Sequence, residues 1–291
     1  MVALLSPRDQ KVWFVTGTSS GLGRAIVYSA LSRGDKVIAT SRTLASIRDL
    51  QSPCCHIMQL DVTDSPAVLD KKAEEAIRIF GRVDVVVNNA GFGAFGIAEE
   101  IGAEGFMKQY QTNVFGVINV TNAFLPHMRA RRDGTIVNVG SRSAWRTSVP
   151  MIAAYTSSKA ALRALTETMA VEVAPFGVRM LLVEPGGLRT ANFNNKQVLE
   201  RRRPSPEAYD RTRQAALAWV DSITGKEPGD PFRAAHAIAD VVRGEGAARN
   251  RPWPGQLILG EDAAQDVRAK AEAVIRHLDE WKDVRDVAIA Q

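Results

Sequence analysis

The chain has 291 residues, of which 45% are hydrophobic and 24% charged, and its formal net charge is +5. This ordinary globular composition is enough for one large α/β domain and does not require a second one. The basic residues are scattered apart from residues 129–132 and 201–203, so we interpret them as solvated surface and expect no nucleic-acid partner.

The two cysteines, Cys54 and Cys55, are neighbours, which excludes a disulfide framework and offers too few ligands for a zinc site. They indicate a reduced compartment. No stretch is apolar and long enough for a signal peptide or a membrane span. We therefore expect a soluble, cytoplasmic protein without a metal or a membrane partner.

A short apolar run at residues 11–16 predicts the first strand, and a glycine-rich turn and a helix follow it directly. Glycines allow the main chain to approach a pyrophosphate closely, and the free N–H groups at the start of the helix bind its negative charge. The turn predicts a dinucleotide-binding segment made of Gly17, Thr18, Ser19, Ser20, Gly21, Leu22 and Gly23.

The residues after the second predicted strand, 36–40, indicate which cofactor is bound. Folds that bind NAD usually place an acid there for the ribose 2′-hydroxyl, whereas an arginine suits a 2′-phosphate. The acid is absent and Ser41 and Arg42 stand in its place, so we predict NADP(H). The alternative is that Arg42 is only a surface residue in a loop.

Two more strands are predicted at residues 56–60 and 83–87. Asp61 and Val62 follow the first of them and resemble a contact to the adenine side of a dinucleotide, although Asp61 could equally form a turn. The second is wholly apolar, which is typical of a central strand in a parallel sheet. It runs into Asn88, Asn89, Ala90 and Gly91, where asparagine side chains can hold the turn open beneath a cofactor.

Asn113 lies in a predicted long helix that ends near Arg131, a place where asparagine is unfavourable by propensity. A fifth strand at residues 135–139 follows. Ser141 and Ser143 stand at its carboxyl end, where ligands bind in open α/β sheets.

The next predicted helix carries Tyr155 and Lys159. Residues four apart share one face of a helix, so the phenol and the ammonium group can point into the same pocket. A nearby cation stabilises phenolate and lowers the pKa of tyrosine from about 10, which indicates an acid/base pair. Taken alone, this spacing is also common on ordinary solvated helices.

A sixth strand is predicted at residues 178–183. Residues 262–291 then form a tail with apolar residues at helical spacing, namely Val267, Ala271, Val274, Ile275, Leu278 and Trp281. We expect an amphipathic helix that packs on the domain or on a neighbouring subunit.

Together these motifs resemble the short-chain dehydrogenase/reductase family over residues 10–260. They occur in the family's order: TGTSSGLG at 16–23, NNAG at 88–91, a helix asparagine at 113, a serine after the fifth strand, YTSSK at 155–159 and PGGLRT at 185–190. The resemblance implies a Rossmann-type α/β fold, a doubly wound parallel sheet of about seven strands in a single domain at residues 11–261, with residues 256–260 as the last strand. Residues 1–10 would be an N-terminal extension and residues 262–291 a helical tail.

The resemblance also implies roles for the site residues. Tyr155 would be the general acid/base, Lys159 would bind the nicotinamide ribose and lower the Tyr155 pKa, and Asn113 would hold a water of the proton relay. Ser141 would polarise the substrate oxygen. The cofactor loop after the sixth strand would contribute Pro185, Gly186, Leu188 and Thr190, with Thr190 on the nicotinamide carboxamide.

The spacing from serine to tyrosine is one residue longer than is common in the family, which makes Ser143 an alternative to Ser141. We prefer Ser141 because it directly follows residues 138–140, the position that the family's strand motif gives to this serine.

The predicted function is reduction of a ketone or aldehyde, or the reverse reaction, by hydride transfer with NADP(H), similar to carbonyl reductases and hydroxysteroid dehydrogenases. A substrate lid is expected at about residues 190–231, where Phe193, Tyr209 and Trp219 favour an apolar or ring-containing substrate unless they are core residues. An NAD-linked secondary-alcohol dehydrogenase and a non-catalytic dinucleotide-sensing regulator are the alternatives. The family commonly forms homodimers or homotetramers.

Overall fold

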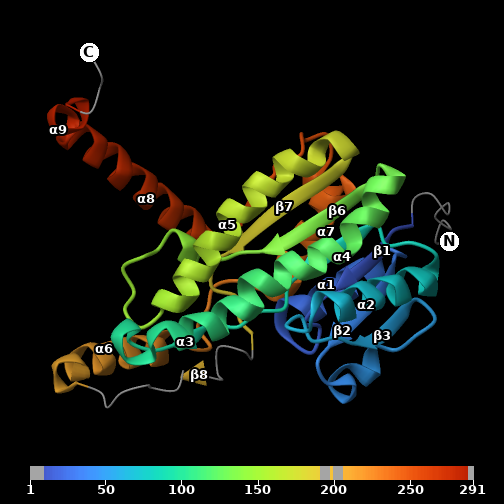
Figure 1. Cartoon of the computed structure of the whole chain (residues 1–291), viewed down its shortest axis with the longest axis horizontal. Coiled ribbons are helices and arrows are strands. Elements are labelled where there is room, and N and C mark those ends of the chain that lie inside the picture. Colours follow the sequence, from blue (N-terminus) through green and yellow to red (C-terminus); the bar gives the residue numbers. More distant parts are fainter. Residues whose placement is uncertain (1–9, 191–196, 199–205, 288–291) are drawn as a thin grey trace.

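A parallel sheet of seven strands forms the centre of the computed structural model, which describes residues 10–190, 197–198 and 206–287 (Figure 1). The strand order is β3-β2-β1-β4-β6-β7-β9. The strands are β1 Val12–Val15, β2 Lys36–Ser41, β3 Cys55–Gln59, β4 Val85–Asn88, β6 Gly134–Val139, β7 Val178–Pro185 and β9 Gln256–Leu259. The seven predicted strands and the doubly wound Rossmann-type fold are thus confirmed.

Helices cover both faces of the sheet. Helices α1 Gly21–Ser32 and α7 Pro231–Arg243 pack on one face, and α2 Pro66–Phe80, α4 Gly116–Arg131 and α5 Ala153–Val173 pack on the other (Figure 1). The remaining helices are α3 Ala98–Tyr110, α6 Asp210–Ile223, α8 Glu261–Glu280 and α9 Lys282–Asp286. In the described part of the chain, no helix is long and apolar enough to span a bilayer.

Short elements connect these layers. Strands β5 Ala94–Phe95 and β8 Gln197–Val198 pair with each other in parallel, and a π-helical turn at Gln111–Phe115 joins α3 to α4. Single 3-10 turns lie at Leu44–Leu50, Arg142–Ala144, Ala174–Phe176, Glu207–Tyr209 and Gly246–Ala248.

Alternating side chains of the strands build one apolar layer on each face. Trp13 and Phe14 are consecutive in β1 and both fully buried, and they point to opposite faces because the side-chain period of a strand is two. Trp13 packs in the layer beneath α1 and α7, and Phe14 packs in the layer beneath α2 and α4, where its ring centre lies 4.6 Å from that of Phe124. This burial on both faces explains why the strands are apolar runs without polar alternation.

The topology places a ligand site between two neighbouring strands. From β1 the chain winds outward to β2 and β3, and it then returns to β4 on the other side of β1 and continues to β9. The carboxyl ends of β1 and β4 are therefore the switch point at which open α/β sheets bind ligands. The turns that follow these two strands are the predicted cofactor turns.

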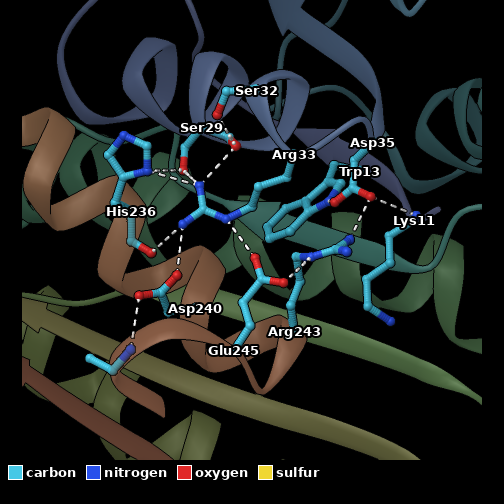
Figure 2. A network of polar contacts seen from close by, with 11 residues as sticks. Lys11, Trp13, Ser29, Ser32, Arg33, Asp35, His236, Asp240, Arg243 and Glu245 are labelled. Carbon is cyan, nitrogen blue, oxygen red and sulfur yellow. Dashed lines mark hydrogen bonds and ion pairs between the residues drawn. The ribbon is translucent and has the colours of Figure 1, made fainter. Parts of the chain in front are cut away.

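A network of polar side chains joins α1 to α7 at the opposite edge, near the amino ends of the strands (Figure 2). Asp35, which is fully buried, accepts hydrogen bonds from the Lys11 amide (2.8 Å), Trp13 Nε1 (2.8 Å) and Arg243 Nη1 (2.6 Å). Arg33 at the end of α1 bonds to Ser29, His236, Asp240 and Glu245. This network fixes the framework far from the carboxyl edge of the sheet.

Part of the predicted lid is an ordinary helix packed on the domain. The Tyr209 hydroxyl donates to Glu99 Oε2 (2.7 Å), and Arg213 in α6 forms an ion pair with the buried Glu100 in α3. Tyr209 also packs beside a small apolar cluster, which is the core role left open above. Phe193 lies outside the described residues.

The tail forms the expected amphipathic helix, but most of it does not pack on the domain. Helix α8 projects from the body of the molecule (Figure 1), and the side chains of Val274, Ile275, Leu278 and Trp281 are 47–59% exposed. Of its residues, only Ala263 in the first turn is fully buried. Packing on the domain is therefore wrong for the outer part of α8, and contact with a neighbouring subunit stays a prediction.

Candidate active site

The two turns at the switch point are bonded to each other. Thr16 Oγ1 accepts the amide N–H groups of Asn89 (3.0 Å) and Ala90 (2.9 Å), and Asn89 Nδ2 donates to the carbonyl oxygens of Thr16 (2.9 Å) and Gly17 (3.0 Å). Gly17 has φ +70°, and a Cβ there would lie 2.9 Å from Ala90 Cα. Only glycine fits this conformation and this approach. Asn89 thus ties the turn after β4 to the first turn through the main chain, and its role beneath a cofactor stays a prediction.

The start of α1 suits an anion. The helix begins at Gly21, and no acidic side chain lies in its first turn, so its N–H groups and dipole favour negative charge. A Cβ at Gly23 would lie 2.3 Å from Asn89 Nδ2, which shows how closely the helix approaches the second turn. These crowded turns, in which a side chain would fill the space, fit a dinucleotide pyrophosphate.

The other predicted residues of the first turn do not all face the same way. Thr18 is fully buried, and its hydroxyl donates to the Thr40 carbonyl (3.1 Å), which holds the turn on β2. Leu22 packs in the apolar layer of α1. Ser19 is exposed and Ser20 is partly exposed. The side chains of Thr18 and Leu22 therefore support the turn, and its main chain is what can meet a ligand.

Arg42 lies exposed beyond β2. Among the described residues, its guanidinium has no hydrogen-bond or ion-pair partner, and its carbonyl oxygen accepts a bond from Gln59 Nε2 (3.0 Å). Ser41 is nearly buried, and its hydroxyl lies 3.0 Å from Ser46 Oγ. Arg42 is thus available to an anionic group, whereas the Ser41 side chain is bonded within its loop.

Asp61 is used as a turn former, the alternative left open by the sequence. Its Oδ1 accepts the amide (2.9 Å) and the hydroxyl (2.7 Å) of Thr63. Val62 is buried, and a Cβ at Gly116 would lie 2.9 Å from Val62 Cγ2, so the start of α4 packs against it. A contact of Asp61 or Val62 with adenine stays a prediction.

Asn113 lies in the π-helical turn and is fully buried. Its Oδ1 accepts the Phe92 amide (3.2 Å), and its Nδ2 donates to the Phe92 carbonyl (3.0 Å) and to Ser158 Oγ (3.2 Å). The side chain therefore fixes the segment after Gly91 to α5. Its predicted place in a proton relay stays a prediction.

Ser141 and Tyr155 are brought together. Ser141 follows the end of β6 and is 7% exposed, and its side chain is hydrogen-bonded to that of Tyr155. Ser141 Oγ also accepts the Ser143 amide (3.1 Å). This arrangement favours Ser141 over Ser143 as the partner of Tyr155, because Ser143 contributes its main chain to holding Ser141.

Lys159 lies one helical turn beyond Tyr155 and is 6% exposed. Its Nζ donates to the Val139 carbonyl (2.7 Å) and is 5.9 Å from the centre of the Tyr155 ring. Burial lowers the pKa of Lys159 to about 8, while the negative charge of Glu184 acts in the opposite direction. The ammonium group is thus placed between the end of β6 and the tyrosine.

Tyr155 differs from the expectation in one respect. Its pKa is raised above the ordinary value, chiefly by burial, and the hydrogen bond from Ser141 opposes this rise. Lys159 was expected to lower the Tyr155 pKa, but among the protein groups described it does not overcome the desolvation. The phenol is therefore held in its protonated form.

The loop after β7 crosses the first turn. A Cβ at Gly21 would lie 3.2 Å from Thr190 Cγ2, so Thr190 rests on the glycine-rich turn. The Gly186 amide donates to the Leu259 carbonyl (2.7 Å), and Leu188 forms a bridge to Gly229. Pro185, Gly186, Leu188 and Thr190 thus belong to one continuous segment, of which Thr190 lies against the glycine-rich turn.

Sequence reasoning did not assign a site role to three residues around this site. Thr16 bonds the two turns, Ser158 bonds Asn113, and Glu184 is a fully buried acid that accepts hydrogen bonds from Trp145 Nε1 (2.9 Å) and Gln256 Nε2 (2.6 Å). Burial raises the Glu184 pKa. Thr16 and Ser158 stand inside the quoted motifs, whereas Glu184 has only its place at the end of an apolar strand as a signal.

Known proteins share both the sequence pattern and the fold. A family model described as short chain dehydrogenase matches residues 11–200. A short-chain dehydrogenase from Streptomyces avermitilis is 36% identical with a TM-score of 0.84, and the match covers 97% of this chain and 100% of that one.

Two solved structures that are each 25% identical contain different cofactors. A short chain dehydrogenase from Burkholderia cenocepacia in complex with NADP has a TM-score of 0.68, and the match covers 92% of this chain and 97% of that one. A short chain dehydrogenase/reductase from Burkholderia phymatum in complex with NAD has a TM-score of 0.76, with 94% and 97% covered. With its dinucleotide turns and its Ser141, Tyr155 and Lys159 in one site, the chain belongs to the short-chain dehydrogenase/reductase family.

Proposed function

We propose that this protein reduces a ketone or aldehyde to an alcohol with NADPH, with Tyr155 as the general acid. The observation that carries the proposal is the hydrogen-bonded pair of Ser141 and Tyr155 beside Lys159, at the carboxyl end of β6. The glycine-rich turn and the start of α1 fit the pyrophosphate of the cofactor.

The chemistry divides between the cofactor and the protein. When NADPH is bound, the nicotinamide supplies the hydride that the carbonyl carbon receives. Ser141 donates a hydrogen bond to the carbonyl oxygen, and Tyr155 transfers its proton to the oxygen as negative charge develops there. Lys159 stabilises the phenolate that remains, which then regains a proton from water.

The protonated phenol of Tyr155 is consistent with the role of proton donor in carbonyl reduction. A raised pKa keeps the phenol protonated near neutral pH, and a protonated phenol is the form that donates. The reverse reaction needs phenolate, which the same burial disfavours. The rate of alcohol oxidation is therefore expected to reach its maximum at a higher pH than the rate of carbonyl reduction.

The preference for NADPH is proposed from Arg42. Its guanidinium is exposed just beyond β2, where a ribose 2′-phosphate would lie, and an arginine fork matches phosphate oxygens. The solved relatives bind NADP in one case and NAD in the other, so the choice rests on this residue. An NAD-linked alcohol dehydrogenase is the alternative that the test distinguishes.

Replacing Arg42 tests this preference. In Arg42→Ala, the Kd for NADPH is expected to rise about tenfold or more, because a charge-assisted contact to phosphate is lost, while the Kd for NADH stays unchanged. Binding is measured by the fluorescence of the reduced nicotinamide. Arg48→Ala, another exposed arginine in the same loop, is the control. Tighter binding of NADH than of NADPH by the wild type would contradict the proposal.

The substrate class is proposed from the lid. Trp219 in α6 is partly buried, and the guanidinium of Arg146 lies 4.9 Å from its ring centre, so an aromatic surface faces the segment after Ser141. This supports an apolar or ring-containing carbonyl. A panel of aliphatic, aromatic and alicyclic ketones and aldehydes, followed by loss of NADPH absorbance, is the direct screen. Faster turnover of small polar aldehydes than of ring ketones would contradict it.

Self-association is proposed from exposed apolar side chains outside the site. Met107 in α3 and Phe115 beside α4 are 59% and 47% exposed, and the outer apolar face of α8 is uncovered in the single chain. Sedimentation analysis is expected to give a homodimer or homotetramer.

A further inference from the structure

The base of α8 reaches the active-site edge of the sheet through Asp262, the second residue of that helix. Asp262 Oδ2 accepts the Gly187 amide (2.9 Å) and pairs with Arg142 Nη1 (2.8 Å). Asp262 Oδ1 accepts the Ala263 amide (3.0 Å). One carboxylate thus joins the loop after β7, the loop after β6 and the start of the projecting helix.

The Asp262 carboxylate packs closely against the main chain of two glycines. A Cβ at Gly186 would lie 2.0 Å from Asp262 Oδ1, and a Cβ at Gly260 would lie 2.7 Å from the same atom. Real Cβ atoms do not approach an oxygen so closely, so both positions need glycine to admit the carboxylate. Gly186 of the PGGLRT motif is therefore matched to Asp262 in this chain, besides any approach to a cofactor.

Arg142 connects this carboxylate to the catalytic pair. It directly follows Ser141 and begins the 3-10 turn whose Ser143 amide bonds to Ser141 Oγ. Its Nη1 also lies 3.5 Å from Asp266 Oδ2, one turn further along α8. The orientation of the Ser141 loop is thus tied to α8 by a planar group with two acidic partners.

We propose that Arg142 and Asp262 are a positioning pair that holds the Ser141 loop and the Gly186–Gly187 loop in register, so that the base of α8 is part of the active-site framework. The inference rests on the proposed function, since it assigns Ser141 to the carbonyl oxygen. Both residues act through their neighbours: Arg142 through Ser141, and Asp262 through the cofactor loop.

The partial exposure of Arg142 and Asp262 makes it possible to distinguish a role in positioning from a role in the stability of the fold. The side chains of Arg142 and Asp262 are 20% and 22% exposed, and ion pairs with this access to solvent contribute little to the stability of a fold. A small displacement of a catalytic group, in contrast, slows a reaction strongly. Loss of the pair should therefore change kcat much more than the thermal midpoint.

The test compares Asp262→Asn, Arg142→Gln, the double variant and Arg142→Lys. Asparagine keeps the size that fits between Gly186 and Gly260 but loses the charge. Each single variant is expected to lower kcat about tenfold or more, with KM for the carbonyl and Kd for NADPH within about threefold of the wild type. The double variant should lose no more than a single one, and Arg142→Lys should recover part of the loss.

Asp279→Asn is the matched control, because Asp279 is an exposed acid on the outer part of the same helix. A wild-type kcat in either single variant, or additive losses in the double variant, would overturn the pair. The pair would also be overturned if activity fell only in proportion to the fraction of protein that binds NADPH, because that result indicates a structural role.

Amide hydrogen exchange separates this inference from the proposed function. In the variants, the Gly187 and Ser143 amides are expected to exchange faster than in the wild type, whether or not any carbonyl is reduced. If the wild type binds NADPH but reduces no carbonyl, the proposed function fails and the exchange rates still decide the inference. Unchanged exchange at both amides would overturn it.

Discussion

At the scale of single residues, two buried groups with opposed pKa shifts define the chemistry. Tyr155 has a raised pKa and is held protonated, while Lys159 has a lowered pKa of about 8 and is close to losing its proton under mildly basic conditions. Both shifts have burial as their main cause, since low-dielectric surroundings disfavour the charged form. The site is thus poised to donate one proton and to hold one positive charge.

The Lys159 shift predicts a pH dependence of stability. Because its folded pKa of about 8 lies below the ordinary lysine value of 10.5, the unfolded chain binds more protons between these pH values, so the free energy of unfolding should rise with pH there. The contribution of Lys159 to the free energy of unfolding is fully present above about pH 10.5 and is lost as the pH falls through about 8. It amounts to about 3 kcal/mol.

Denaturant unfolding of the wild type and Lys159→Met from pH 7 to 10.5 measures this contribution. The difference between the two proteins should change by about 3 kcal/mol across the range. A difference that does not depend on pH would contradict the lowered pKa.

The site residues could be predicted where the order of motifs along the chain identifies them. They could not be predicted where their role depends on contacts between residues that are distant in the sequence. The Tyr155–Lys159 spacing and the dinucleotide turn follow from local patterns. Ser141 and Ser143 follow the same strand end; the strand motif favours Ser141, and the hydrogen bond to Tyr155 supports that preference. The direction of the Tyr155 pKa was wrong because a sequence shows a neighbouring cation but not the depth of burial. Asp262 is far from Arg142 in the sequence and lies outside every motif.

At the scale of elements, apolar runs predict central strands such as β1, β4 and β6 because these strands are buried on both faces, whereas the edge strand β9 is only partly buried and was expected from the family resemblance. The two-residue strands β5 and β8 are too short for such a pattern. The π-helical turn at residues 111–115 also has no periodic signal. Helix α6 was expected only as part of a lid, since its buried face meets α3 rather than the sheet.

The link between α6 and α3 leads to a prediction for Arg213. Its side chain is 9% exposed and pairs with Glu100, which is 2% exposed, and breaking a buried ion pair is strongly destabilising. Arg213→Ala is expected to lower the free energy of unfolding by about 3 kcal/mol and to raise KM for the carbonyl through a loosened lid.

Denaturant unfolding and steady-state kinetics measure the two effects. Arg211→Ala, an exposed position on the same helix, should change neither. Arg213→Ala with a wild-type KM and stability would show that α6 is not held by this pair.

At the scale of the whole molecule, the two edges of the sheet have separate tasks. The carboxyl edge carries the cofactor turns and the catalytic pair, and the amino edge carries the network around Asp35 that joins α1 to α7 (Figure 2). Asp35 is fully buried and Arg243 is 9% exposed, so the pair lies out of solvent. Stability and activity should therefore be separable by mutation.

Asp35→Ala tests this separation. It removes the acceptor of Trp13 Nε1, of the Lys11 amide and of Arg243 Nη1, and it breaks a buried ion pair, so the free energy of unfolding should fall by about 3–5 kcal/mol. NADPH affinity and kcat should be unchanged at temperatures where the variant is folded. Asp49→Ala, in an ion pair whose acid is 58% exposed, is the control and should change stability by about 0–1 kcal/mol. Loss of kcat in folded Asp35→Ala would show that the two edges are coupled.

The central claim is that Tyr155 is the proton donor in an NADPH-dependent carbonyl reduction. Tyr155→Phe keeps the ring and removes the hydroxyl that bonds to Ser141, so NADPH should bind with unchanged Kd while kcat falls about a hundredfold or more. The measurement is NADPH consumption by the wild type and by this variant with the best carbonyl of the panel. Reduction by Tyr155→Phe within about tenfold of the wild-type rate would contradict the account.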